Sequence, residues 1–224
     1  TCALPISWVK DPFRPTRDLD LLGFGDGDVA PIAEAFRIIG AQPVVDDGVV
    51  FDTDALEAAP IREELEYGGV RVRTTAIVAR ARIPIQIDVG FGDAITPVPL
   101  EIDYPTLLDS PTPHLRAYPV ETVIAEKFEA LTTLGIANSR LKDFYDLWQI
   151  SQTFGFQHSQ LFAAIQRTFE RRGTALPSAL PVGLSDDFVI AWSAQWRAFL
   201  GRERMAIAPE TLGSVVADLR KFLM

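Results

Sequence analysis

The sequence is very poor in cysteine and histidine. Cys2 is the only cysteine among 224 residues, and His114 and His158 are the only histidines. A disulfide framework and a zinc site built from cysteine or histidine are therefore excluded. No apolar run is long enough to span a membrane, and the opening TCALPISWV lacks the basic start and apolar core of a signal peptide. We therefore expect a cytoplasmic protein.

Positive charge is also scarce. The chain has 21 Lys and Arg against 30 Asp and Glu, a net charge of -9, so as a whole it is not a basic nucleic-acid binder. The first 117 residues hold 10 basic and 19 acidic side chains, a balance that suits metal binding, whereas the remainder holds 11 of each. Within that neutral half, RTFERR (167–172) could still meet a polyanion locally.

The pattern of predicted elements changes near residue 115. Short strands are predicted over residues 18–24, 48–52, 70–81 and 83–91. A helix over 29–39 is capped by Asp28 and ended by Gly40. TPVPLEIDYP is predicted to be an edge strand, because proline cannot donate to a ladder, and a loop, DSPTPHLRAYP, follows it. From Val120 onward the pattern is helical. We expect an α+β fold, with a mixed-sheet domain over residues 1–115 and a helical domain over 116–224.

Two aspartates, Asp18 and Asp20, stand at the beginning of the first predicted strand. In an extended chain both side chains point to the same side, where they repel unless a proton or a cation lies between them. Carboxylate oxygens of this kind suit Mg²⁺ that is shared with substrate phosphates. If the strand carrying Asp88 is a neighbour, three acids could hold two Mg²⁺ ions for phosphoryl or nucleotidyl transfer. The alternative is a solvated strand end with unrelated acids.

Lys127 lies on the apolar side of a helix predicted over residues 118–135. Its neighbours three and four positions away are all apolar, namely Val123, Ile124, Ala130 and Leu131. A lysine in this position must find an anion or extend its ammonium group to solvent. A bound phosphate is the alternative to the solvent-exposed ammonium.

The next predicted helix begins with NSRLKDFYDLW (138–148). It carries Asp143 and Asp146 one turn apart, with Arg140 and Lys142 within pairing distance. A salt-bridged helix surface is the ordinary explanation for these four charges.

The segments RPTRDLDLLGFGD, IPIQIDVGFGD and YPVETVIAEKFEAL, followed by NSRLKDFYDLW, resemble the AbiEii/AbiGii nucleotidyltransferase toxin family. The similarity runs from about Pro12 to the end of the chain. It implies a DNA-polymerase-β-like nucleotidyltransferase domain with a mixed sheet, followed by a C-terminal helical domain. It also implies Mg²⁺-dependent transfer of a nucleotide from a nucleoside triphosphate to an acceptor, such as tRNA. The protein would then be the toxin of a bacterial toxin–antitoxin pair, with a cognate antitoxin as a further partner.

The resemblance also implies roles for individual residues. Asp18 and Asp20 match the metal-binding pair, and Asp88 matches the third metal-binding acid. Lys127 matches a catalytic, nucleotide-binding lysine and Asp143 a catalytic acid. We also expect Arg17, next to the acid pair, to bind nucleotide. The family often has a basic residue two positions before the acid of its second motif, where this chain has Gln86.

One part of the family pattern is missing at the start of the chain. A glycine-containing turn, whose backbone N–H groups hold the triphosphate, would fall at or just before residue 1. The chain begins without methionine, and TCALPIS contains no glycine. We therefore expect an N-terminally truncated fragment that binds nucleoside triphosphate weakly and is itself inactive. Two alternatives stay open, a non-catalytic relative that binds a partner or nucleotide, and a small-molecule nucleotidyltransferase with a closed, acidic acceptor pocket.

Overall fold

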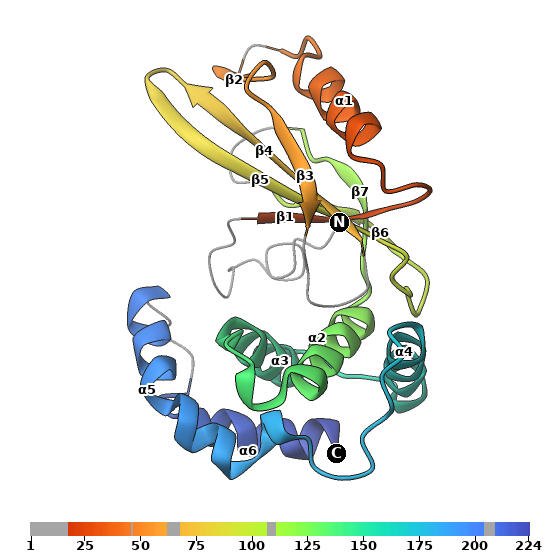
Figure 1. The fold of residues 1–224 in the computed structure, drawn as a ribbon, viewed down its shortest axis with the longest axis vertical. Helices are drawn as coiled ribbons and strands as arrows, with labels where there is room; N and C mark the ends of the chain where they lie inside the picture. The colour runs from red at the N-terminus through yellow and green to blue at the C-terminus, as the bar shows by residue number, and fades with distance from the viewer. Residues whose placement is uncertain (1–17, 46, 62–67, 107–110, 204–208) are drawn as a thin grey trace. The chain divides into compact units, whose positions relative to one another are not determined.

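The computed structural model describes residues 18–45, 47–61, 68–106, 111–203 and 209–224. These residues form two compact units, which divide between residues 93 and 94 (Figure 1). The first unit holds a mixed sheet and one helix, and the second holds a two-stranded sheet and a set of helices. The α+β class with a helical C-terminal region is therefore confirmed. The division into domains at residue 115 stays a prediction.

The first unit is built on a five-stranded sheet in the order β1–β5–β4–β2, in which β3 also pairs with β4. Strand β1 runs parallel to β5, and all other pairs are antiparallel. Strands β4 and β5 form a long hairpin closed by Ala79 and Arg80 (Figure 1). The strand bounds are Asp18–Gly23 (β1), Val49–Phe51 (β2), Glu57–Ile61 (β3), Gly69–Val78 (β4) and Ala81–Phe91 (β5).

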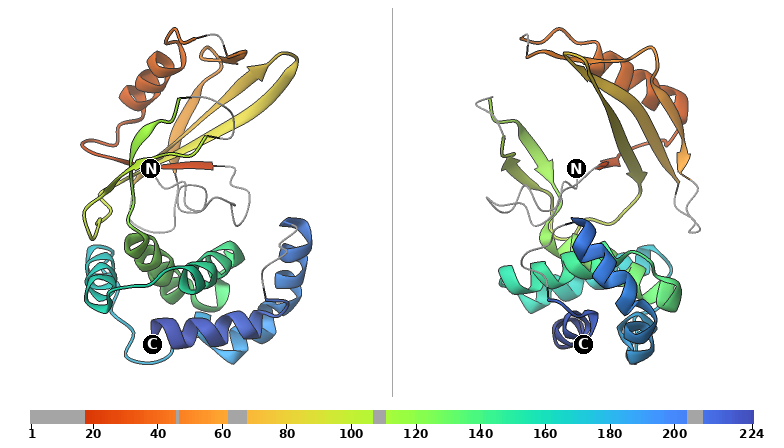
Figure 2. Two further views of the ribbon diagram at one scale, coloured as in Figure 1. Left: turned by 180° about the vertical axis from the view of Figure 1, so that it is seen from behind. Right: turned by 90° about the vertical axis from the view of Figure 1, so that its left-hand side faces the viewer.

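The two faces of this sheet differ because apolar and polar residues alternate along β4 and β5. Val70 and Val72 of β4 and Ile87 and Val89 of β5 are buried on one face. Helix α1 (Val29–Gly40) packs on that face and completes a small core, as the turned views in Figure 2 show. Side chains at the intervening positions project from the opposite face. This second face carries charged residues of β1, β4 and β5.

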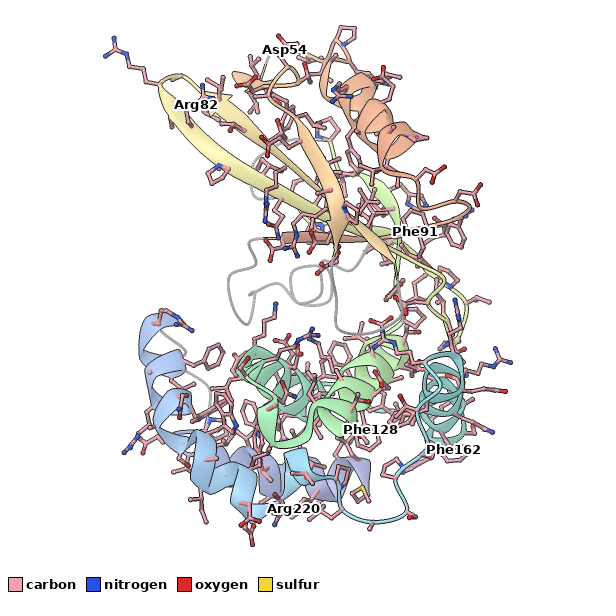
Figure 3. The ribbon with its side chains drawn as sticks, viewed as in Figure 1. Asp54, Arg82, Phe91, Phe128, Phe162 and Arg220 are labelled. Atoms are coloured by element: carbon pink, nitrogen blue, oxygen red, sulfur yellow. The ribbon has the colours of Figure 1, made fainter. Side chains whose placement is uncertain are left out.

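The second unit begins with an antiparallel pair of strands, β6 (Leu100–Asp103) and β7 (His114–Ala117). Its core is aromatic, because Phe144, Phe169 and Trp196 are fully buried. The ring of Phe128, labelled in Figure 3, lies 5.4 Å from that of Phe169 and joins α2 to α4. The helices are Val120–Leu134 (α2), Leu141–Thr153 (α3), His158–Arg171 (α4), Asp186–Glu203 (α5) and Leu212–Leu223 (α6), with 3-10 turns at Gly135–Ala137 (η1) and Val182–Leu184 (η2).

Two strands, β7 and β3, were not predicted. The edge strand predicted in TPVPLEIDYP is β6, but it pairs with β7 and not with the main sheet; β7 itself lies in a segment predicted to be a loop. Strand β3 was not predicted, since EAAPI is rich in alanine and contains Pro60. Pro60 is tolerated there because, among the described residues, β3 pairs only with β4, so its missing N–H can lie on the unpaired side.

Candidate functional site

The acids predicted to form a metal site lie on two neighbouring strands. The parallel register of β1 and β5 places Asp18 beside Gln86 and Asp20 beside Asp88. Register partners and alternate residues share a face, so all four side chains project from the face opposite α1. Asp18 is half-buried and Asp20 is exposed. The strand adjacency on which the predicted acid cluster depends is thus confirmed, whereas its role in metal binding stays a proposal.

Asp88 is held by an arginine that the sequence analysis did not single out. Arg71 of β4 is its antiparallel register partner. The arginine donates from Nε to Oδ1 at 2.7 Å and from Nη2 to Oδ2 at 2.6 Å. This is a two-pronged, charge-assisted pair that fixes the plane of the carboxylate. The alternating Arg-Val-Arg at the start of β4 was the available signal, since it places two arginines on the face of the acids.

A second row of side chains runs parallel to the first, one pleat further along the strands. Gln86 donates from Nε2 to Oδ1 of Asp18 at 3.1 Å. Its Oε1 accepts from Nε of Arg73 at 3.2 Å. Gln86 stands at the position where the family often has a basic residue. It connects Asp18 to Arg73 on the next strand.

The donors on this face fit a divalent cation in their chemistry. Mg²⁺ prefers carboxylate oxygens, which Asp18 and Asp20 supply from one strand. Both oxygens of Asp88 accept from Arg71, but each oxygen has two lone pairs, so one on each can still meet a cation. Within the described ranges, no three Asp, Glu, His or Cys side chains are already close enough together to hold a metal ion. A cation bound by all three acids would require their carboxylates to move closer together.

Lys127 of α2 forms a buried charge cluster with two acids of α3. Its Nζ lies 2.5 Å from Oδ1 of Asp143 and 3.1 Å from Oδ2 of Asp146. The side chains of Lys127, Asp143 and Asp146 are only 11%, 9% and 4% exposed. The predicted position of Lys127 on a buried helix face is confirmed, because its apolar neighbours Ile124 and Leu131 are fully buried.

The cluster changes the electrostatics of the lysine. Burial alone would lower the pKa of Lys127, but Asp143 and Asp146 outweigh that effect and raise the pKa well above its ordinary value. The lysine is therefore charged at every physiological pH. The surface explanation for Asp143 and Asp146 is wrong, because both acids face the interior. The i, i+3 spacing of the two acids on one helix face was the signal that could have paired them with Lys127.

A second buried ion pair lies between α2 and the end of α4. Glu129 is 1% exposed, and its Oε2 accepts from Nη1 of Arg172 at 3.0 Å. Thr133 and Thr174 donate to its other oxygen at 2.6 Å and 2.7 Å. Burial would raise the pKa of Glu129, but these donors and the charge of Arg172 lower it overall. Arg172 therefore has an internal partner, which reduces the basic surface that RTFERR was expected to offer.

The remaining predicted site residue, Arg17, lies outside the described residues. The other predicted residues fall into two groups. Asp18, Asp20 and Asp88 are gathered on the sheet of the first unit, and Lys127 and Asp143 contact each other in the second.

A mixed sheet that sets an Asp-x-Asp strand in parallel register with a third acid has the arrangement expected of a nucleotidyltransferase. The sequence profile of the nucleotidyl transferase AbiEii toxin family, of the type IV toxin–antitoxin systems, matches residues 3–217. The chain belongs to this family and is a nucleotidyltransferase.

Two solved structures from Helicobacter pylori are similar to this chain. The crystal structure of JHP933 has a TM-score of 0.48 and 13% identity, covering 94% of this chain and 78% of its own. A second, named provisionally as a nucleotidyltransferase, has a TM-score of 0.47 and 12% identity, covering 94% of this chain and 80% of its own. No curated protein matches the chain. In the part of the chain that the structure describes, no helix is both long and apolar enough to cross a membrane.

Proposed function

We propose that this protein transfers a nucleotide from a nucleoside triphosphate to an RNA acceptor, such as tRNA, with the help of Mg²⁺. The observation that carries the proposal is the parallel register of β1 and β5, which sets Asp20 beside Asp88 with Asp18 on the same face. Carboxylates that lie this close together repel one another, and a divalent cation shared with a substrate phosphate would offset that repulsion. Family membership supports an enzyme over the non-catalytic alternative.

In this proposal the three acids of the sheet are the cation ligands. Asp18 and Asp20 bind it from one strand, and Asp88 binds it from the next with its carboxylate plane fixed by Arg71. When bound, Mg²⁺ neutralises charge on the attacking and leaving oxygens of an in-line displacement. Gln86, bonded to Asp18, restricts the rotation of that carboxylate and so keeps it turned toward the site.

Lys127 and Asp143 are proposed to act on the nucleotide. An ammonium group has three N–H donors, and Asp143 and Asp146 accept two of them. The third donor is left to bind a phosphate oxygen. In this role the two acids fix the position of Nζ, and Asp143 keeps the lysine charged.

Family membership supports a nucleotide substrate and an antitoxin partner, and the RNA acceptor is part of the proposal. A toxin of a type IV system has a nucleotide substrate and a cognate antitoxin, and we place its activity in the bacterial cytoplasm. An RNA acceptor accords with the neutral charge balance of residues 118–224 better than with that of the acidic first half. The internal engagement of Arg172 means that RNA contacts must come from other residues.

The test is a transfer assay with the full-length protein. Each labelled nucleoside triphosphate is incubated with total RNA, with and without Mg²⁺, and label is measured in the RNA and in the small-molecule fraction. Asp20→Asn should reduce transfer at least a hundredfold without changing the circular dichroism spectrum, because a cation ligand is lost. Asp26→Asn, at an exposed position after β1, is the matched control. Near-normal transfer by Asp20→Asn would remove Asp20 from the site, and label confined to small molecules would refute the RNA acceptor.

A further inference from the structure

Two arginines lie on the same face of β4 as the acids, and their surroundings differ. Arg71 and Arg73 are two residues apart, and the register places them beside Asp88 and Gln86 respectively. Arg71 meets a carboxylate through two short hydrogen bonds, so its charge is balanced. Among the described residues, Arg73 meets only a neutral amide, that of Gln86, through Nε. Of these two guanidinium groups, that of Arg71 is neutralised and that of Arg73 keeps its full positive charge.

No acid of the described chain balances the charge of Arg73. The residue opposite it on β3 is Glu57, but the two form no ion pair, and no other carboxylate of the described ranges lies within ion-pair distance of Arg73. The side chain is exposed. A guanidinium group has five N–H donors, of which Gln86 accepts one from Nε. The four donors on Nη1 and Nη2 are left, in the planar arrangement that binds two oxygens of a phosphate.

Gln86 sets both the distance and the orientation of this guanidinium relative to the acid pair. Its amide oxygen accepts from Arg73 and its amide nitrogen donates to Asp18, and only one orientation of the amide satisfies both bonds. Arg73 is thus two strand spacings from Asp18, or about 10 Å between backbones. The long arginine side chain reaches across part of that distance.

We infer that Arg73 binds a phosphate of the nucleoside triphosphate whose reacting phosphate lies at Asp18 and Asp20. The inference rests on the proposed function, because it takes those acids as the cation site. A triphosphate that approaches three carboxylates needs positive charge beyond the cation, and Arg73 supplies it at the end of the hydrogen-bonded row. Its role is to hold the part of the triphosphate that is not reacting, and thus to position the reacting phosphate.

The experiment compares triphosphate and monophosphate forms of the transferred nucleotide as ligands of the full-length protein. Binding is measured by calorimetry with Mg²⁺, for the unsubstituted protein and for Arg73→Gln and Arg73→Lys. Arg73→Gln should weaken triphosphate binding roughly tenfold or more, because a charge-assisted contact is lost. Binding of the monophosphate should change little. Arg73→Lys should recover part of the loss, since it keeps the charge but not the planar donors. The salt dependence of triphosphate binding should also become weaker in Arg73→Gln.

The matched control is Arg82→Gln on the same hairpin. Arg82, labelled in Figure 3 near the hairpin tip, is exposed and paired with Asp52 at 2.9 Å, away from the acid row. The Arg82→Gln variant should bind the triphosphate and the monophosphate as tightly as the unsubstituted protein does. Equal triphosphate binding by Arg73→Gln and Arg82→Gln would overturn the inference, and so would equal losses for triphosphate and monophosphate. Loss of RNA binding with unchanged triphosphate binding would overturn it as well.

Failure of this inference can be told apart from failure of the proposed function. If the protein transfers nucleotide and Asp20→Asn does not, but Arg73→Gln binds triphosphate normally, only the role of Arg73 falls. If Asp20→Asn transfers nucleotide normally, the proposed cation site is refuted, and the proposed role of Arg73 loses its basis.

Discussion

Replacing Lys127 by methionine should destabilise the protein strongly. Methionine keeps an unbranched stem of similar length but removes the ammonium group, which leaves Asp143 and Asp146 buried without their shared cation. Breaking a buried ion pair by removing one partner costs about 3–5 kcal/mol, since the remaining charge is neither hydrated nor paired. Two carboxylates are stranded here, so we expect a loss at the upper end of that range. Urea unfolding followed by circular dichroism measures it.

Acid should relieve part of this loss. In Lys127→Met the two stranded aspartates are buried and repel each other, and a carboxylate that takes up a proton loses both penalties. Their penalty is therefore fully present at neutral pH and declines as the pH falls and they take up protons. In the unsubstituted protein the pKa of Lys127 is itself raised. Its contribution is complete below the ordinary value of 10.5 and is lost only as the pH rises through the higher folded-state value.

The control is Lys142→Met, the same substitution at an exposed lysine one residue before Asp143. It should change the free energy of unfolding by about 0.5 kcal/mol or less, as exposed substitutions usually do. A triple variant with Lys127→Met, Asp143→Asn and Asp146→Asn should regain much of the stability, because no charge is left in this cluster. If Lys127→Met costs no more than Lys142→Met, the cluster does not stabilise the fold and the reasoning is refuted.

Three other substitutions test the packing of the second unit. Glu129→Gln should cost about 3 kcal/mol by leaving Arg172 charged and without its carboxylate. Because the pKa of Glu129 is lowered, its contribution is present above the ordinary value of 4.5 and lost as the pH falls through the lower folded-state value. The variant should therefore show a flatter acid branch in unfolding free energy against pH, and an unchanged branch would contradict the assignment. Gly183→Ala should be destabilising, because the new Cβ would lie 2.7 Å from the carbonyl oxygen of Leu131. Gly201→Ala, in α5 with nothing within 4 Å, should instead stabilise by up to about 1 kcal/mol, and thermal unfolding of the pair shows whether the two signs differ.

Much of the sheet could be predicted from local patterns. The alternation in IPIQIDVGF identified β5 and the face on which Asp88 lies, and the two-residue spacing of Asp18 and Asp20 gave them a common side. The partner of each strand was harder to predict, because the sequence of a short strand does not specify which strand it pairs with. The segment HLRA is too short and polar to be read as a strand, so β6 was predicted as an edge strand without its partner β7.

The candidate site was predictable as far as its acids and not as far as their partners. The apolar neighbours of Lys127 showed that its position is unusual. Its anionic partner, however, comes from the next helix. The residue spacing within one helix does not predict how two helices pack. For the same reason Arg71 and Arg73 were missed. Their strand was predicted, but only the register of β4 against β5 shows that one neutralises Asp88 while the other does not.

The parallel pairing of β1 with β5 has a consequence for how the protein matures. The hairpin of β4 and β5 closes through a two-residue connection, whereas the row from Asp18 to Gln86 joins residues 68 positions apart. Local contacts form early in folding, and distant ones wait until the entropy of closing a long loop is repaid. A chain emerging from the ribosome exposes Asp18 and Asp20 long before β5 exists. Asp18 and Asp20 therefore leave the ribosome without Gln86 and Asp88 beside them, and β1 can pair with β5 only once translation has passed Phe91.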